Sequence, residues 1–237
     1  MGLLARGRAN ETSPVAYPHA NVDILLALSH VVSPAQAKDM RVAVISSITP
    51  WVEAAIRHYG FSSVVTVDYN PPSTQLMPSS ARVRTIGVDE LRNSKLLFDV
   101  IVSFSGIEHD GLGRYGDPVD ENGDLRAIRE LAKSLAPAGV LLLGVPVGPK
   151  DAVCGSRQRI YGPRRFPQLA VAGGFGCMGA SWDGKWHASH DGCAQMLAAP
   201  PEDRRRFRGK TAEYIARVLS GCDGWRHQPV FVLRVNT

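Results

Sequence analysis

The amino-acid sequence predicts an α/β fold: a doubly wound, mostly parallel, Rossmann-like sheet with helices on both faces. Short, wholly apolar runs recur along the chain, as strands that are covered on both faces require. Segments with apolar residues at helical spacing separate these runs. Because helical crossovers join parallel neighbours, this alternation indicates a parallel sheet. We expect the main strands at Val42–Ile45, 64–67, 100–104, 140–145 and 230–235.

The helices between the strands follow from their apolar spacing and from residues that begin or end a helix. Asn21 is a suitable N-cap for a helix with buried leucines, and Pro50 and Gly60 bracket a second helix. A further amphipathic segment, residues 202–219, carries arginines on its polar face. We expect helices from residue 21 onward and at Trp51–Tyr59, 88–97, 124–135, 164–172 and 202–219, with additional strands at 83–86 and near 178–182.

The sequence outside and between these elements indicates the domain organisation. Residues 1–20 are polar and carry Pro14 and Pro18, so we expect an N-terminal arm. No repeat or linker divides residues 21–237, which we expect to form one domain. With 237 residues, 44% of them hydrophobic, such a domain can bury its own core. No apolar run approaches the roughly 20 residues of a membrane-spanning helix, so we expect no such helix in this chain.

Charge and cysteine content narrow the expected partners and compartment. The 27 basic and 22 acidic residues leave a net charge of +5, which suits an anionic ligand but is also common in soluble enzymes. Nucleic-acid binding through the arginines at 204–208 therefore ranks last among our hypotheses. The four cysteines are far apart and form no CxxC pair, which favours a reducing, cytoplasmic compartment over a disulfide-stabilised secreted fold.

The first candidate site residues follow the first two strands, because ligands bind beyond the carboxyl ends of strands in an open parallel sheet. Ser46, Ser47 and Thr49 offer hydroxyls and amides to a polar group at a helix N-terminus, or they only cap the next helix. This loop has no glycine and matches neither the dinucleotide nor the P-loop signature. Asp68 ends the second strand, where a carboxylate accepts two ribose hydroxyls or simply caps a turn.

The densest polar segment, residues 103–118, follows the strand at 100–104. It holds four glycines, three carboxylates, a histidine and an arginine. His109 is the candidate general base, because its ordinary pKa of about 6.5 lies near working pH and the carboxylates of Glu108 and Asp110 flank it. The alternative is a loop whose charged residues only pair with one another.

A second basic and aromatic cluster follows the strand at 140–145. Its members are Arg157, Arg159, Tyr161, Arg164 and Arg165. Such a cluster can clamp an anionic or sugar-like substrate. Equally, its arginines can pair with Asp110, Asp117 and Asp120, and the sequence leaves both readings open.

Metal and hydrolase chemistry find little support in the sequence. His187, His190 and Cys193 have the spacing of no known zinc motif, and a fourth ligand is not evident, so no metal is expected. There is no GxSxG motif, and Cys154 has no identifiable catalytic partner.

Four motifs carry a family resemblance. They are TPWVEA at 49–54, VTVDYN at 65–70, SGIEHDGLGRYGDP at 105–118 and RIYGP at 159–163. Together they resemble an uncharacterised family of unknown function within the class I S-adenosylmethionine-dependent methyltransferase-like superfamily. The similarity runs from about residue 41 to residue 165, with an echo at 228–233, and the longest motif is specific to that family.

The resemblance implies a class I methyltransferase-like fold and S-adenosylmethionine as the cofactor. By position, Ser46, Ser47 and Thr49 would bind its methionine part, and Asp68 would bind its ribose hydroxyls. Val88 and Asp89 would lie near its adenine, and Ser103 and Ser105 would flank its sulfonium group. The pair Glu108–His109 looks like the Glu-His pair that many superfamily members carry after the fourth strand. Superfamily members usually have glycines and an acidic residue in the first loop, so this chain departs from the pattern at Ser46.

These observations predict a methyltransferase that acts on a hydroxyl of a small polar or glycan acceptor. His109 and Asp110 are the expected catalytic residues, with His109 deprotonating the acceptor. Arg114, Tyr115, Arg159 and Tyr161 are expected to orient the acceptor. The competing hypothesis is a catalytically inactive, methyltransferase-shaped module that binds a ligand or a partner, which the glycine-free first loop favours.

Overall fold

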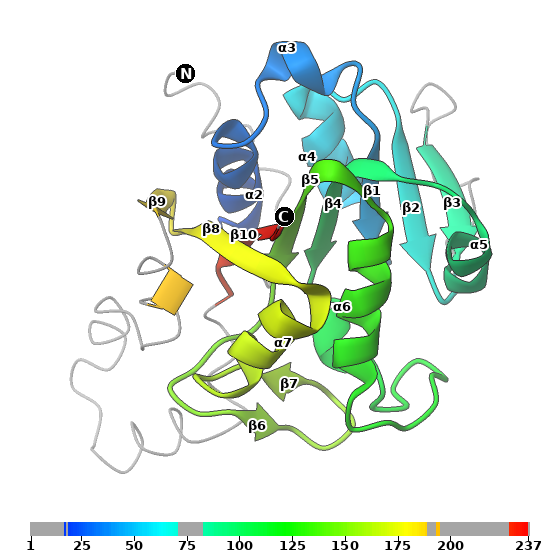
Figure 1. The fold of residues 1–237 in the computed structure, drawn as a ribbon, viewed down its shortest axis with the longest axis vertical. Coiled ribbons are helices and arrows are strands. Elements are labelled where there is room, and N and C mark those ends of the chain that lie inside the picture. Colours follow the sequence, from blue (N-terminus) through cyan, green and yellow to red (C-terminus); the bar gives the residue numbers. More distant parts are fainter. Residues whose placement is uncertain (1–16, 18, 71–82, 189–192, 195–227, 237) are drawn as a thin grey trace.

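A single large sheet organises the part of the chain that the computed structural model describes, namely residue 17 and residues 19–70, 83–188, 193–194 and 228–236. Its eight strands have the order β3-β2-β1-β4-β5-β10-β8-β9 (Figure 1). They are β1 (Val42–Ile45), β2 (Val64–Asp68), β3 (Val83–Gly87), β4 (Phe98–Phe104), β5 (Leu135–Gly144), β8 (Phe175–Trp182), β9 (Lys185–Ala188) and β10 (Val230–Val235).

The sheet has a parallel half and an antiparallel edge. Strand β1 pairs in parallel with both β2 and β4, and β3 and β5 extend this parallel half on either side. Strand β10 runs antiparallel between β5 and β8, and β9 pairs antiparallel with β8. The predicted doubly wound, mostly parallel, Rossmann-like sheet is confirmed. Because the chain leaves β1 for β2 and leaves β4 for β5, on opposite sides, the carboxyl ends of β1 and β4 form the switch point of the sheet.

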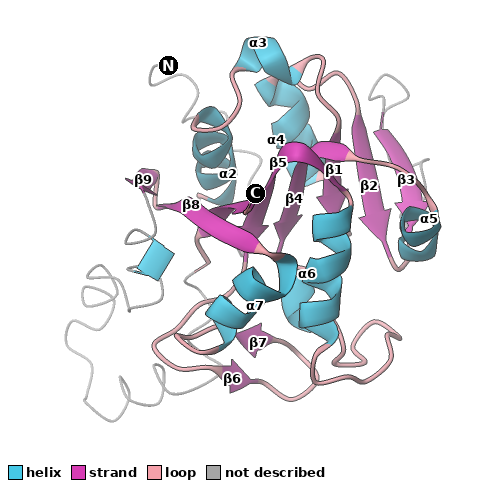
Figure 2. Ribbon diagram, in the orientation of Figure 1, coloured by secondary structure: helices cyan, strands magenta, loops and turns pink. Residues whose placement is uncertain are grey.

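Helices cover both faces of the sheet, which explains the wholly apolar strands (Figure 2). On one face, α2 (Ala20–Ser29) and α4 (Trp51–Tyr59) pack against Val42 and Val44 of β1. On the other face, Ala43 and Ile45 of the same strand join the core under three helices. These are α5 (Val88–Asn93), α6 (Gly123–Lys133) and α7 (Arg165–Gly173).

The structure also contains short elements that the sequence patterns did not predict. A hairpin of β6 (Ala152–Val153) and β7 (Arg159–Ile160) stands beyond the carboxyl ends of the strands, and α3 (Pro34–Ala37) follows a capping box at Ser33. Such elements are too short to show a period in the sequence. Helix α5 ends at Asn93, earlier than expected, and the helix predicted at 202–219 lies outside the described residues.

A disulfide joins Cys177 of β8 to Cys193, with 6.5 Å between their Cα atoms, and Cys154 is disulfide-bonded as well. The wide spacing of the cysteines did not predict this, because the antiparallel edge brings distant segments together. The bond argues against the expected reducing compartment. It also removes Cys193 from the proposed group with His187 and His190, the last of which lies outside the described residues.

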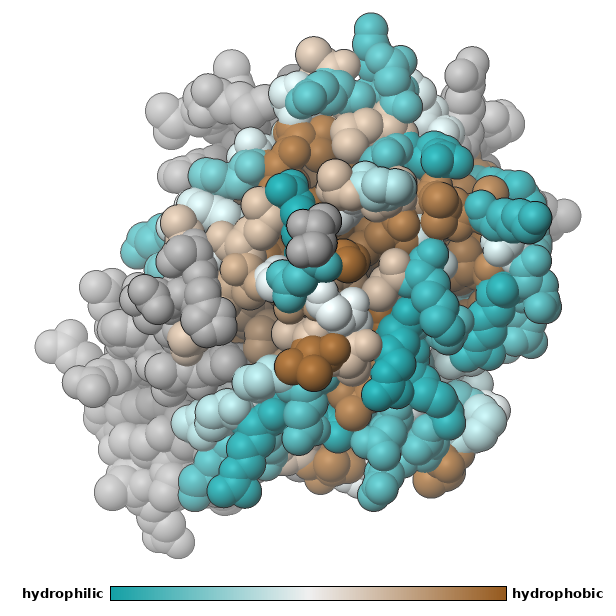
Figure 3. Space-filling model, in the orientation of Figure 1, coloured by the Kyte–Doolittle hydropathy of each residue, from teal (hydrophilic) through white to brown (hydrophobic). Residues whose placement is uncertain are grey.

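The described surface is mixed in character. Figure 3 shows hydrophilic side chains over α5 and α6, with apolar side chains gathered toward the middle of the same face. Among the described helices, none has the length and apolar content needed to cross a membrane.

Candidate functional site

Two cavities open where the parallel strands end. The large cavity has a volume of about 620 Å³ and lies between the loop after β1, helix α4, the loop after β4 and the turn of the β6–β7 hairpin. The small cavity, of about 50 Å³, lies on the β2 side and is lined largely by apolar groups. Both cavities share only Ile45 and Ser46, so the end of β1 separates them.

The loop after β1 lines the large cavity with Ser46, Ser47 and Thr49. The Ser47 hydroxyl donates to Glu53 Oε2 at 2.9 Å, and Thr66 Oγ1 donates to Glu53 Oε1 at 2.7 Å. Glu53 is buried, and that burial raises its pKa. The hydroxyls do not cap α4, whose N-cap has no side-chain hydrogen bond, so that alternative is wrong. The buried Glu53 instead anchors the loop from below.

Ser46 adopts a left-handed backbone conformation with φ of 60°, and its amide donates to the Val67 carbonyl at 2.8 Å. This conformation costs a residue with a side chain roughly 1–2 kcal/mol. A Cβ atom on Gly106 would lie 2.8 Å from the Ser46 Cβ atom. The chain therefore accommodates a side chain at the end of β1 because the loop after β4 has none at this point of contact.

The residues expected to bind the adenosine part of a cofactor lie at the ends of the neighbouring strands β2 and β3 but do not line one cavity together. Val88 lines the small cavity, together with Val67 and Tyr69. Asp68 is half-buried at the end of β2 between those two residues and lines neither cavity; its Oδ1 accepts from the Asn70 amide at 2.8 Å. Burial raises the Asp68 pKa.

Two further residues expected to bind the cofactor, Asp89 and Ser103, line neither cavity either. Asp89 is exposed and pairs with Arg92 at 3.2 Å. Ser103 is fully buried within β4, and its hydroxyl has no hydrogen-bond partner among the described residues. A direct cofactor contact from either side chain is therefore not supported by its position. Ser105, two residues further along, does line the large cavity.

A chain of polar contacts leads from the large cavity into the protein. The Tyr17 hydroxyl and Ser105 Oγ are 2.9 Å apart, and Ser105 Oγ donates to Glu108 Oε1 at 2.8 Å. Glu108 is fully buried, which raises its pKa to about 7, and its Oε2 has no hydrogen-bond partner among the described residues. The carboxyl group of Glu108 thus keeps its proton to near-neutral pH.

His109 lines the large cavity with a defined tautomer. Its Nδ1 lies 2.5 Å from the Arg157 carbonyl oxygen, which can only accept, so Nδ1 carries the proton and Nε2 carries the lone pair. Burial lowers the His109 pKa to about 4, although the bond to the Arg157 carbonyl opposes this shift. Nε2 lies 3.6 Å from Glu108 Oε1. At neutral pH the ring is therefore uncharged and able to accept a proton.

Asp110 does not join His109. It lines the small cavity, on the other side of the η2 turn (Ile107–His109). Burial, together with the charges of Asp117 and Glu108, raises the Asp110 pKa to about 7. The expectation that His109 and Asp110 form one catalytic pair is corrected, because successive residues of the turn point to opposite sides.

The glycines of the long motif make its turns. The Asp117 carboxylate accepts from the amides of Gly111, Gly113 and Tyr115 at 2.7–3.1 Å. Burial opposes ionisation of Asp117, but these hydrogen bonds outweigh it and hold the pKa below its ordinary value. Gly111 has a φ of 79°, and a Cβ atom there would lie 2.1 Å from the Asp120 carbonyl oxygen. Much of this motif therefore shapes the loop rather than carrying chemistry.

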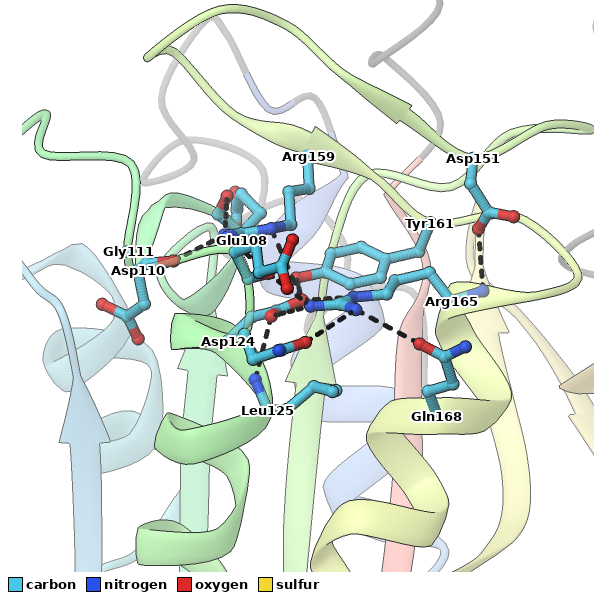
Figure 4. A network of polar contacts seen from close by, with 12 residues as sticks. Glu108, Asp110, Gly111, Asp124, Leu125, Asp151, Arg159, Tyr161, Arg165 and Gln168 are labelled. Carbon is cyan, nitrogen blue, oxygen red and sulfur yellow. Dashed lines mark hydrogen bonds and ion pairs between the residues drawn. The ribbon is translucent and has the colours of Figure 1, made fainter. Parts of the chain in front are cut away.

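Beneath this loop lies a buried network around Asp124 (Figure 4). The fully buried Asp124 carboxylate accepts from the Tyr161 hydroxyl at 3.1 Å and from Arg165 NH2 at 2.5 Å, and Arg159 Nε lies 3.7 Å away. Arg159 also donates to the carbonyl oxygens of Asp110 and Asp120 at 2.5 and 3.2 Å. The network ties the β6–β7 hairpin and α7 to the loop after β4.

The positions of Arg159 and Tyr161 correct their expected role as acceptor-binding residues. Arg159 is 3% exposed, Tyr161 is fully buried, and neither lines the large cavity. Burial raises the Tyr161 pKa well above its ordinary value. The two side chains instead hold in place the loop that carries His109. The alternative pairing with Asp110, Asp117 and Asp120 is also wrong in detail, since the carboxylate partner is Asp124.

Arg114 and Tyr115 do line the large cavity, as expected for acceptor-binding residues. The Arg114 guanidinium lies 5.2 Å from the centre of the Tyr115 ring and donates to the Arg157 carbonyl at 2.8 Å. The structure adds lining residues that the sequence did not single out for this site: Tyr17, Trp51, Phe104 and Gln158. Apolar spacing assigned Trp51 and Phe104 to the core, and no sequence signal places Tyr17 at the site.

Solved structures of methyltransferases share this fold. The 1,6-didemethyltoxoflavin-N1-methyltransferase of Burkholderia thailandensis, solved with 1,6-didemethyltoxoflavin and S-adenosylhomocysteine, aligns with a TM-score of 0.58 at 15% identity, over 98% of this chain and 84% of that one. The mitomycin 7-O-methyltransferase MmcR aligns with a TM-score of 0.53 at 10% identity, over 90% of this chain and 53% of its own.

The N,N-8-amino-8-demethyl-D-riboflavin dimethyltransferase RosA of Streptomyces davawensis aligns with a TM-score of 0.51 at 12% identity, over 90% of this chain and 53% of its own. The chain thus spans about half the length of the last two enzymes. At these identities the similarity concerns the fold, which is that of class I methyltransferases.

Sequence comparison identifies the family directly. No curated protein matches the chain. The model of the family described as "Caenorhabditis protein of unknown function, DUF268" matches residues 39–198, more than half of the sequence. These residues include both cavities' loops and the buried network. The chain therefore belongs to the DUF268 family, whose fold is that of the class I methyltransferases.

Proposed function

We propose that the protein is an S-adenosylmethionine-dependent methyltransferase that acts on a hydroxyl group of a small polar or glycan acceptor. The observation that supports this most is the position of His109, which lines the large cavity at the switch point of the sheet. Its imidazole is neutral, with the proton on Nδ1 and the lone pair on Nε2. An imidazole in such a position can accept the proton of a hydroxyl group, and its lowered pKa, unlike the expected value near 6.5, makes it a weaker base than an exposed histidine.

The residues around β1 fit S-adenosylmethionine in their chemistry. Hydroxyls of Ser46, Thr49 and Ser105 line the large cavity and suit its amino-acid part, while Val67 and Val88 offer apolar surface for its adenine. Asp68, half-buried at the end of β2 between Val67 and Tyr69, carries a carboxylate suited to the ribose hydroxyls. When bound, the cofactor supplies an electrophilic methyl group.

The chain's own residues would then position the acceptor and remove its proton. Arg114 and Tyr115 hold the acceptor against the cavity, and His109 Nε2 accepts the proton of its hydroxyl group. Glu108 Oε1 lies 3.6 Å from this same Nε2 atom, and the Arg157 carbonyl fixes the ring orientation from the Nδ1 side. Most of the rate enhancement is expected from holding the reacting groups in line at short distance.

A second candidate function is supported by the small cavity. Its volume of about 50 Å³ and the Ser46 side chain at its border favour a methyltransferase-shaped module that binds a ligand without catalysis. The two candidates differ in whether S-adenosylmethionine binds at all.

Calorimetric titration of the full chain with S-adenosylhomocysteine tests the proposal. We expect binding that the Asp68→Asn variant weakens by roughly 10–100-fold, which corresponds to the ~1.5–3 kcal/mol of a hydrogen bond to a charged group. The exposed Asp39→Asn variant is the matched control and should bind as the wild type does. No heat with millimolar S-adenosylhomocysteine or S-adenosylmethionine would reject the enzyme and leave the binding module.

The catalytic role of His109 has a separate test. His109→Ala should lower the formation of S-adenosylhomocysteine from S-adenosylmethionine and acceptor by roughly 10²–10⁴-fold. Its affinity for S-adenosylhomocysteine should remain within a few-fold of the wild-type value. His58→Ala, on the exposed side of α4, serves as the control, and equal loss in both variants would contradict the assignment.

A further inference from the structure

The large cavity has a positively charged lining. Arg114 and Arg157 both line it, and neither guanidinium forms an ion pair within the described part of the chain. None of the described lining residues is a carboxylate. The third basic side chain in the cavity lining, His109, is neutral at pH 7 because of its lowered pKa.

The carboxylates around this cavity have other surroundings, and Glu53 behind the loop after β1 accepts from Ser47 and Thr66. Glu108 is fully buried and accepts from Ser105 Oγ. Asp110 lines the small cavity, and Asp117 accepts from three backbone amides of its own loop. The charge of the two arginines is therefore available to a ligand rather than to the protein.

Part of the cavity lining is aromatic. The rings of Tyr17 and Trp51 are stacked with their centres 6.4 Å apart and an angle of 21° between their planes. Phe104 meets both rings edge-on, at 5.3 Å from Tyr17 and 5.4 Å from Trp51. These contacts hold the wall in one arrangement, and such a surface suits a flat apolar face of a ligand.

We infer that the large cavity selects an acceptor that carries a carboxylate beside a flat apolar face, with Arg114 and Arg157 binding the carboxylate and the Tyr17–Trp51–Phe104 wall contacting the flat face. Arginine suits this role because its planar fork matches a carboxylate with two parallel hydrogen bonds. The inference rests on the proposed function in naming the acceptor of that site. Aromatic hydroxy acids and acidic sugars share the required chemistry.

Matched pairs of probes test the inference on the full chain. The binding of 4-hydroxybenzoate is compared with that of 4-hydroxybenzyl alcohol, and the binding of glucuronate with that of glucose, by calorimetry. We expect the anion of at least one pair to bind at least roughly tenfold more tightly than its neutral partner, and the pair with the larger ratio identifies the source. Equal affinities within both pairs, or no binding of either anion at millimolar concentration, would overturn the inference.

Variants locate the effect. The double variant Arg114→Gln, Arg157→Gln should abolish the preference for the anion and weaken the anion far more than its neutral partner. Arg129→Gln, on the exposed side of α6, is the control and should preserve the preference. Trp51→Leu should weaken both members of the preferred pair by a similar factor. A preference that survives the double variant would contradict the assignment.

A parallel titration with S-adenosylhomocysteine separates this inference from the proposed function. Binding of S-adenosylhomocysteine without any anion preference rejects the acceptor class alone. An anion preference without S-adenosylhomocysteine binding rejects the methyltransferase alone. If the double variant instead loses S-adenosylhomocysteine and keeps its anion preference, the arginines serve the cofactor carboxylate and the inference fails.

Discussion

Two pairs of arginines have opposite surroundings in the structure. Arg159 and Arg165 lie in the buried network, where Asp124 and several backbone carbonyl groups accept their hydrogen bonds. Arg114 and Arg157 are exposed at the large cavity, and neither has a carboxylate partner among the described residues. Arg157 and Arg159 are only two residues apart, at the turn and at the first residue of β7.

The difference indicates what each pair does. A buried guanidinium must have its charge and its donors satisfied by the protein, so Arg159 and Arg165 stabilise the loops around them. An exposed guanidinium in a cavity without carboxylates costs the fold little and keeps its donors for a ligand. The residue type is the same in both pairs, so the presence or absence of a carboxylate partner distinguishes a stabilising arginine from one that can bind a ligand.

The largest expected effect breaks the buried network. Asp124→Asn leaves the buried Arg159 and the partly buried Arg165 without a counter-charge, and should lower the free energy of unfolding by ~3–5 kcal/mol. Urea denaturation followed by circular dichroism measures this change. Glu90→Gln, which removes the exposed pair with Arg84, is the control and should cost less than ~1 kcal/mol. Similar losses in the two variants would show that burial does not distinguish the pairs.

A smaller effect concerns the buried carboxyl beneath the cavity. The folded-state pKa of Glu108 is raised from 4.5 to about 7, so the unfolded chain releases this proton first as pH rises. Its contribution to stability is therefore present below pH 4.5 and is lost as pH rises toward 7. Asp110 acts in the same direction, whereas the lowered His109 pKa acts in the opposite one.

Glu108→Gln isolates the contribution of Glu108 to the pH dependence of stability, because Asp110 and His109 are unchanged in the variant. Relative to wild type, the variant should gain about 1–3 kcal/mol in unfolding free energy between pH 4.5 and pH 7, and the difference should stay constant above that window. Denaturation at several pH values measures it. The exposed Glu121→Gln variant should differ from wild type by less than ~0.5 kcal/mol throughout. A difference that shrinks with rising pH would contradict the assigned sign.

The border between the cavities should respond to the relief of backbone strain. In wild type, the left-handed backbone of Ser46 costs ~1–2 kcal/mol because the residue has a side chain. Ser46→Gly relieves this strain but adds an entropy cost of ~0.5–1 kcal/mol, because glycine loses more backbone freedom on folding. We expect a net gain of about 0.5–1 kcal/mol in unfolding free energy. Ser29→Gly, at the end of α2 with an ordinary helical backbone, should lose stability. A loss at Ser46 would show that its side chain stabilises the loop.

The smallest expected effect completes the comparison between the arginines. The double variant Arg114→Gln, Arg157→Gln should change the unfolding free energy by less than ~0.5 kcal/mol, because no ion pair within the described residues is lost. Thermal unfolding measures it directly. A loss approaching that of Asp124→Asn would mean that these arginines also hold the fold together.

The sequence alone determined the mostly parallel sheet and the strand ends at which the two cavities lie, whereas the strand order came from the structure. Apolar runs such as Val42–Ile45 reveal strands that are buried on both faces, and helical spacing reveals the crossovers between them. It also marked His109 and the loop after β1. Only the tertiary structure decided which neighbours of these residues share a cavity. His109 and Asp110 point to different cavities, and Arg157 and Arg159 differ in burial, because side-chain direction in turns follows from local backbone geometry that no sequence period encodes.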